Sequence, residues 1–255
     1  SGETADSLAA LRHLKAMNIK TLAIVNSEGS SISEEADKVL FTAAGREIAV
    51  ASTKAFTLQC QTLLMLAVSI AIKNGKAGRV ETEKILKSHC FAFTDAIPEL
   101  LKNQSEIKTA SEMLAKHKNA FFIGRGADYC LVSEAALKLR EISYIHSEGL
   151  AAGELKHGTI SLIEQDTPVI AIITDPALQQ KTIANIKEVR ARGAQVLCIA
   201  PQNIPLSDCD RLDLPECNDL AAPTAAAVLC QLFAYYAAIA RGTDIDQPRN
   251  LAKSV

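Results

Sequence analysis

The chain has 255 residues, of which 48% are hydrophobic and 22% are charged, and its formal net charge at pH 7 is -2. This composition is that of an ordinary globular protein with one large or two medium domains. The near-neutral balance argues against a dedicated nucleic-acid binder, because such proteins usually carry a basic face.

The longest apolar run, residues 63–72, is roughly half as long as a membrane span, so we expect a buried helix and no membrane association. The start of the chain lacks the basic and apolar regions of a secretory signal. The seven cysteines are scattered and form no CxxC pair. They predict reduced thiols, no bound metal and a cytoplasmic location.

Buried strands and helices are expected to alternate along the chain, because short β-rich apolar runs are separated by helical patterns. The first part predicts helices and strands over residues 4–17, 21–26, 37–41 and 52–74. A polar helical segment follows over residues 78–118, and Pro98 is expected to begin or kink a helix there. The second part predicts elements over residues 120–124, 129–143, 168–174, 178–192, 195–200, 210–214 and 224–241.

This alternation predicts an α/β fold of the doubly wound type with parallel sheets. The motif "NIKTLAIVN" and the short strand and Ala/Leu-rich helix after it recur about 170 to 175 residues later, after "GAQVLCIAP". We therefore expect two tandem domains, of which the first is truncated at its N-terminus. The expected boundaries are a partial first domain over 1–77, a helical linker over 78–118, a second domain over 119–244 and a tail over 245–255.

Two predicted helix starts carry the small hydroxyl residues that bind phosphate groups. The stretch "SGET" opens one helix and "VASTKAF", residues 50–56, opens another through Ser52 and Thr53. Backbone N–H groups and the positive end of the helix dipole favour an anion at such a place. Ordinary helix capping is the alternative explanation for each motif taken alone. The third turn, "GRGADY", lacks the full GxGxxG pattern, which disfavours a dinucleotide site.

Lys138 and Glu141 lie three residues apart and share one helix face. Their apolar neighbours argue against a fully solvated ion pair, and a half-buried carboxylate beside a lysine suits proton transfer. His157 lies on a glycine-flanked turn in "AAGELKHG", where a solvated loop histidine is an equally good interpretation. The tail "GTDIDQPRNLAKSV" follows no regular period and contains Lys253.

Four motifs together resemble the isomerase half of the glutamine-fructose-6-phosphate aminotransferases. They are "SGETADSLAALR", "EIAVASTKAF", "LKLREISYIHSEGLAAGELKHG" and "GTDIDQPRNLAKSV". The resemblance spans nearly the whole chain and implies sugar-isomerase (SIS) domains. It also implies an enzyme that makes glucosamine 6-phosphate from fructose 6-phosphate and glutamine-derived ammonia, without a cofactor.

The resemblance also implies a role for individual residues. Glu141 would move the proton between C1 and C2, Lys138 would be its cationic neighbour, and Lys253 would form an imine with the open-chain ketose. His157 would open the sugar ring from the neighbouring subunit of a homodimer. The residues that the resemblance places around the substrate are Ser1, Thr4, Val50, Ser52 and Ala252. The family's glutaminase domain has no counterpart, because no cysteine precedes Cys60.

Two other functions remain open at this point. A non-catalytic SIS module that binds phosphosugars would need the hydroxyl-rich helix starts, but would not need Lys138, Glu141, His157 and Lys253 together. A related phosphosugar isomerase or deglycase would act without amide transfer, and the tail motif argues against it.

Overall fold

The computed structural model describes residues 1–207 and 209–253. The chain forms two compact units: unit 1 comprises residues 1–82 and 246–255, and unit 2 comprises residues 83–245. The C-terminal tail therefore belongs with the first residues of the chain. Each unit is described by itself below.

Unit 1 contains a small parallel sheet of two strands, and helices precede, separate and follow these strands in the sequence. Its elements are α1 (Ala5–Ala16), β1 (Leu22–Val25), α2 (Ser31–Glu35), β2 (Lys38–Phe41) and α3 (Lys54–Lys73). Strands β1 and β2 pair in parallel from Leu22 with Lys38 to Val25 with Phe41. Leu11, Val25 and Ile32 form the centre of its core. The expected strand–helix order is confirmed here, except that α2 was not predicted.

Asp37 and Thr21 are hydrogen-bonded to each other at the beginning of this two-stranded sheet. Its carboxylate accepts hydrogen bonds from the hydroxyl and the backbone N–H of Thr21, at 2.8 and 2.9 Å. The Asp37 N–H in turn donates to the Thr21 hydroxyl at 3.1 Å. These bonds stabilise the charged carboxylate and lower the pKa of Asp37 to about 2. The residues that directly precede the two strands are thereby joined.

Helix α3 departs from the sequence prediction. The run over residues 63–72 was expected to form a buried helix, but α3 buries only Thr57 and Val68. Leu63 and Ile70 are more than half exposed. A helix becomes buried only where other apolar elements cover it. Among the described residues of unit 1, α3 packs against β1. By length and composition alone, α3 and α9 (Ala222–Arg241) are both apolar enough to cross a bilayer.

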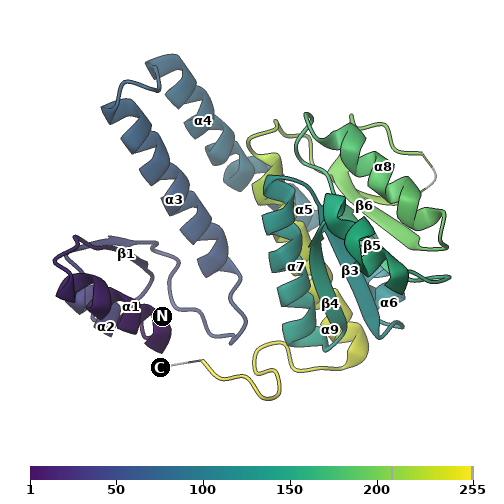
Figure 1. The fold of residues 1–255 in the computed structure, drawn as a ribbon, viewed down its shortest axis with the longest axis horizontal. Coiled ribbons are helices and arrows are strands. Elements are labelled where there is room, and N and C mark those ends of the chain that lie inside the picture. Colours follow the sequence, from purple (N-terminus) through teal and green to yellow (C-terminus); the bar gives the residue numbers. More distant parts are fainter. Residues whose placement is uncertain (208, 254–255) are drawn as a thin grey trace. The chain divides into compact units, whose positions relative to one another are not determined.

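Unit 2 is built on a five-stranded, wholly parallel sheet with the strand order β4-β3-β5-β6-β7. Figure 1 shows α7 and α9 on one side of this sheet and α8 on the other. The strands are β3 (Asn119–Gly124), β4 (His146–Ala151), β5 (Pro168–Ile172), β6 (Gln195–Pro201) and β7 (Asp210–Leu214). The expected α/β architecture with parallel sheets is confirmed.

The helices of unit 2 cover a dense apolar core. Helix α4 (Arg79–Phe91) crosses the boundary between the units, and α9 packs against α6 and α7. The remaining helices are η1 (Ala92–Ala96), α5 (Ile97–Lys102), α6 (Ser105–Leu114), α7 (Ala127–Ser143), η2 (Ala152–His157), η3 (Thr159–Leu162) and α8 (Gln179–Arg190). Phe122, Ile170, Leu229 and Phe233 are at most 1% exposed. Helix α9 is thus a core helix of a covered sheet.

Replacing Thr21 by Val is expected to raise the pKa of Asp37 from about 2 toward its ordinary value of 3.8, because the largest stabilising hydrogen bond is lost. Carbon NMR titration of the Asp37 carboxyl group measures this. A lowered pKa in the folded state contributes stability above pH 4, which is lost as the pH falls toward 2.

Lys20→Ala is the matched comparison, because Lys20 is 91% exposed and contributes only a minor part of the shift. It should move the titration less than Thr21→Val does. An equal or larger effect of Lys20→Ala would contradict the assignment of the shift to the Thr21 hydrogen bonds.

Candidate active site

The segment "SGET" is fixed against α2 by backbone geometry that only glycine permits. Gly2 has φ +82°, and a Cβ there would lie 2.2 Å from the Ser30 hydroxyl oxygen. Its carbonyl accepts a bond from the N–H of Ile32 at 3.0 Å. The Glu3 carboxylate accepts from both the N–H and the hydroxyl of Ser31, which lowers its pKa. The start of the chain therefore has a defined path beside the end of β1.

Both hydroxyl residues of this segment are accessible. Ser1 and Thr4 are exposed. Thr4 is the N-cap residue of α1, yet its side chain makes no capping hydrogen bond. Ordinary capping, which was the alternative explanation for this motif, therefore does not use the Thr4 hydroxyl. The first backbone N–H groups of α1 and this hydroxyl lie at the positive end of a helix of 12 residues.

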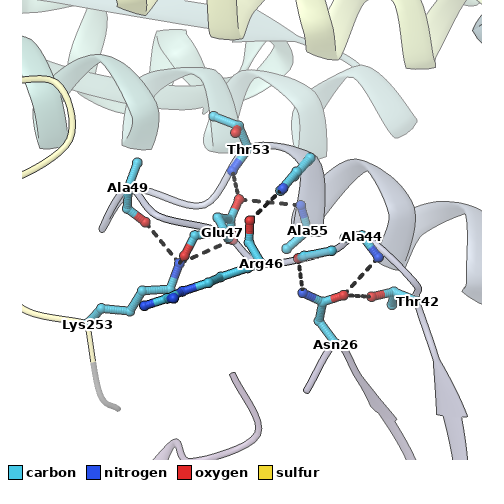
Figure 2. Close-up of polar contacts among 11 residues, drawn as sticks. Asn26, Thr42, Ala44, Arg46, Glu47, Ala49, Thr53, Ala55 and Lys253 are labelled. Atoms are coloured by element: carbon cyan, nitrogen blue, oxygen red, sulfur yellow. Dashed lines mark hydrogen bonds and ion pairs between the residues drawn. The ribbon is translucent and has the colours of Figure 1, made fainter. Parts of the chain in front are cut away.

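The loop after β2 is ordered by Asn26, which directly follows β1. The Asn26 side chain accepts from the Thr42 hydroxyl and the Ala44 N–H, and donates to the Gly45 carbonyl at 2.7 Å (Figure 2). Because β1 and β2 are parallel, these residues lie at the carboxyl ends of both strands. Open α/β sheets bind ligands at this edge.

Lys253 of the C-terminal tail is bound to the same loop (Figure 2). Its ammonium donates to the carbonyl oxygens of Glu47 and Ala49 at 2.8 and 2.9 Å. It also lies 3.6 Å from the Glu47 carboxylate. The N–H of Val50 donates to the carbonyl of Asp246, so the tail is attached at two points. The tail that carries Lys253 thus lies against the loop that follows β2.

Glu47 was not predicted from the sequence, yet its side chain contacts both the start of α3 and Lys253 of the tail. Its carboxylate accepts from the backbone N–H groups of Thr53 and Ala55 at 2.9 and 3.5 Å, at the start of α3 (Figure 2). The anion at this helix start is therefore a side chain of the protein itself. Ser52 is half-buried directly before these groups, and Ala252 is exposed.

In unit 2, Lys138 lies buried between two carboxylates. Its side chain is only 5% exposed, and its ammonium is 2.7 Å from Glu141 and 3.5 Å from Glu134. The predicted pair of Lys138 and Glu141 is thus shielded from water. Glu134 was missed, although its spacing of four residues from Lys138 on one helix is a recognisable signal. Burial raises the pKa of Glu134, and Lys138 opposes that shift.

His157 ends the turn η2 and is exposed. A polar network supports this turn: Lys156 pairs with Glu188 at 2.8 Å, Glu188 accepts from Asn185, and Asn185 accepts from Arg125. The bond from Lys156 lowers the pKa of Glu188.

His157 and Glu141 lie at opposite ends of the unit 2 sheet. Glu141 is in the last turn of α7, shortly before β4 begins opposite Asn119. His157 comes after β4 has ended opposite Gly124. One copy of unit 2 therefore does not bring these two side chains together. A cavity of about 570 Å³ between α6 and strands β5 to β7 is lined by none of the predicted site residues.

Replacing Lys138 by Met is expected to destabilise unit 2 by about 3 kcal/mol at pH 8, because two partly buried carboxylates lose their cation. The pKa of Glu134 is raised in the folded state. The stability of the unit therefore falls as the pH rises above the pKa that this carboxyl group has in the unfolded chain. Removing Lys138 raises the pKa of Glu134 further, so the loss should be smaller at pH 5. Urea unfolding followed by tyrosine fluorescence measures it, because all four tyrosines lie in unit 2.

Lys187→Met is the control, because Lys187 is exposed on α8. It should change the free energy of unfolding little at either pH. A Lys138→Met variant as stable as this control at pH 8 would show that the buried cation does not stabilise the unit.

Comparison with known proteins identifies the family of the chain. The family described as SIS domain matches residues 1–69 and 113–241. A glutamine–fructose-6-phosphate aminotransferase (isomerizing) from Symbiobacterium thermophilum is 49% identical over the whole chain, which spans 42% of that relative's length. The solved C-terminal domain of a glucosamine-fructose-6-phosphate aminotransferase from Francisella tularensis superposes with a TM-score of 0.92. It is 36% identical, over 97% of this chain and 71% of that one.

A solved glucosamine-6-phosphate deaminase from Thermotoga maritima is more distant, with a TM-score of 0.72 and 26% identity, over 100% of this chain and 72% of that one. The chain belongs to the SIS domain family, and within it to the isomerase domains of the glutamine-fructose-6-phosphate aminotransferases.

Proposed function

We propose that the chain is the sugar-phosphate part of an enzyme that converts fructose 6-phosphate and glutamine-derived ammonia into glucosamine 6-phosphate. The observation that carries this proposal is that Lys253 is hydrogen-bonded at the carboxyl edge of the unit 1 sheet. Parallel α/β sheets bind ligands at this edge. The names of relatives that match the whole chain support the same reaction.

Unit 1 provides the proposed substrate site. The hydroxyls of Ser1 and Thr4 at the start of α1 bind the sugar phosphate, and Ser52 with the Val50 backbone lines the pocket. Lys253, next to Ala252, attacks the ketose carbonyl and forms an imine, which activates that carbon for exchange with ammonia. The accessible Thr4 hydroxyl and the two-point attachment of the tail support these roles.

Unit 2 provides the proposed proton-transfer groups. Glu141 removes the proton from one carbon and returns it to the next, and the ammonium of Lys138 lies 2.7 Å from its carboxylate. His157 opens the sugar ring. Because Glu141 and His157 lie at opposite ends of one sheet, a site that uses both takes one of them from a second copy. This argues for a homodimer with a shared site.

The two units are further proposed to be tandem copies of one domain. In unit 1 the parallel pair β1 and β2 precedes α3, and in unit 2 the parallel pair β6 and β7 precedes α9. Both final helices have 20 residues. Unit 1 corresponds in this scheme to the last part of unit 2.

Calorimetry with fructose 6-phosphate and glucosamine 6-phosphate tests the substrate class. We expect both ligands to bind the chain, and Thr4→Val to weaken binding by about tenfold, because the loss of a hydrogen bond to a charged group costs about 1.5 kcal/mol. Thr109→Val, at an exposed position of α6 in unit 2, is the matched control. Tight binding without any turnover in the longer protein would favour a non-catalytic SIS module instead.

Glu141→Gln is expected to abolish formation of glucosamine 6-phosphate in a protein that also carries the glutaminase domain. A glutamine side chain cannot accept the proton, and such a loss corresponds to a factor of at least about 100. Product is measured by its appearance over time, with glutamine hydrolysis recorded in parallel, and the latter should persist.

Glu148→Gln is the control for this experiment, because Glu148 is an exposed carboxylate of β4. It should leave synthesis intact. Unchanged synthesis by Glu141→Gln would remove Glu141 from the role of proton carrier.

A further inference from the structure

Lys253 cannot form an imine while its nitrogen is an ammonium, which is the ordinary form of a lysine side chain. Its nitrogen donates two hydrogen bonds and lies beside a carboxylate, which is the environment of a charged ammonium. An ammonium has no lone pair with which to attack a carbonyl. The lysine must therefore lose a proton to a nearby group before it can react.

Among the residues that the structure describes, three oxygen atoms lie within reach of this nitrogen, and one of them belongs to a group that can take a proton. Two are the backbone carbonyl oxygens of Glu47 and Ala49, which accept hydrogen bonds and do not become protonated. The third is the side-chain carboxylate of Glu47, 3.6 Å away. Its side chain is 10% exposed, so bulk water has little access to it.

The Glu47 carboxylate is also fixed in place from its other side. Its second oxygen accepts the N–H groups of Thr53 and Ala55 at the start of α3. Figure 2 shows the carboxylate between these N–H groups and the end of the Lys253 side chain. One oxygen thus faces the helix start and the other faces the lysine. The carboxylate cannot follow the lysine when the lysine swings toward a substrate.

We propose that Glu47 accepts the proton that Lys253 must lose and donates it to the leaving hydroxyl group when the imine forms. This rests on the proposed function of Lys253. The ammonium gives one proton to Glu47, and the freed lone pair forms a bond to the ketose carbonyl carbon. The former carbonyl oxygen becomes a hydroxyl by taking a proton from the attacking nitrogen. The Glu47 proton then joins this hydroxyl, which leaves as water while the C=N bond forms.

The proton count closes in this sequence. Lys253 enters as an ammonium and ends as a protonated imine, one water is released, and Glu47 ends as the carboxylate that it was at the start. No oxidant or reductant takes part. The carboxylate therefore acts as a temporary proton store at a fixed position beside the reacting nitrogen.

Reductive trapping tests this directly. The chain is incubated with fructose 6-phosphate and sodium cyanoborohydride, and the rate of covalent adduct formation at Lys253 is followed by mass spectrometry. Glu47→Gln should slow this rate roughly 100-fold, as expected for loss of a positioned proton acceptor. The glutamine carbonyl can still accept the Thr53 N–H, so the start of α3 is preserved while the charge beside Lys253 is removed.

Two further measurements separate proton transfer from a structural role. Affinity for fructose 6-phosphate, measured by calorimetry, should stay within about threefold of the unchanged chain, because glutamine has nearly the same shape as glutamate and still accepts the Thr53 N–H. The amide NMR signals of Thr53 and Ala55 should remain those of a helix start. Glu34→Gln, an exposed carboxylate of α2, should trap at the normal rate.

The outcomes distinguish this inference from the proposed function beneath it. An unchanged chain that binds the sugar phosphate but gives no adduct at Lys253 would overturn the imine assignment and, with it, the role of Glu47. An adduct that forms equally fast in Glu47→Gln would overturn the role of Glu47 alone. Loss of affinity and of the helix-start signals in Glu47→Gln, in parallel with slower trapping, would make Glu47 a structural residue and overturn the proposal as well.

Discussion

Parallel pairing of strands is the constraint from which the candidate site follows. In unit 1 it aligns the ends of β1 and β2, so that Asn26 after the first strand can bond the loop after the second. That ordered loop then offers its carbonyl groups to Lys253 from the far end of the chain. An antiparallel pair would place these two loops at opposite edges of the sheet.

Much of the fold was readable because buried parallel strands leave a strong signal. Strands β3 and β5 are buried at nearly every position, and their apolar runs were recognised. Strand β4 was missed because it lies at the sheet edge, pairs only with β3 and exposes His146 and Glu148. It also contains Gly149, which weakens a strand pattern. A Cβ there would lie 2.6 Å from the Ser133 backbone, so the close approach of α7 requires the glycine.

Contacts in the candidate site between residues close in the sequence could also be predicted, whereas contacts between distant residues could not. Lys138 and Glu141 could be paired from their spacing on one helix, and Glu134 follows the same rule. Glu47 carries no such signal, because its partner Lys253 is 206 residues away and its bond to the start of α3 matches no capping box. For α3, the apolar run correctly predicted a helix but did not predict how much of that helix other elements would cover.

Lys138 and Lys253 differ in burial and in bonding partners, and this difference suits them to different roles. Lys138 is 5% exposed and lies between two carboxylates, so leaving that position would strand their charges in a shielded place. It is suited to remain charged and stationary beside Glu141. Lys253 is 29% exposed, and two of its three acceptors are neutral carbonyl groups that water can satisfy when it departs. A lysine bound in this second way can leave its carbonyls at low cost, as the proposed imine requires. The proposal also needs an acceptor for its proton, and the Glu47 carboxylate at 3.6 Å is the group to which we assign that role.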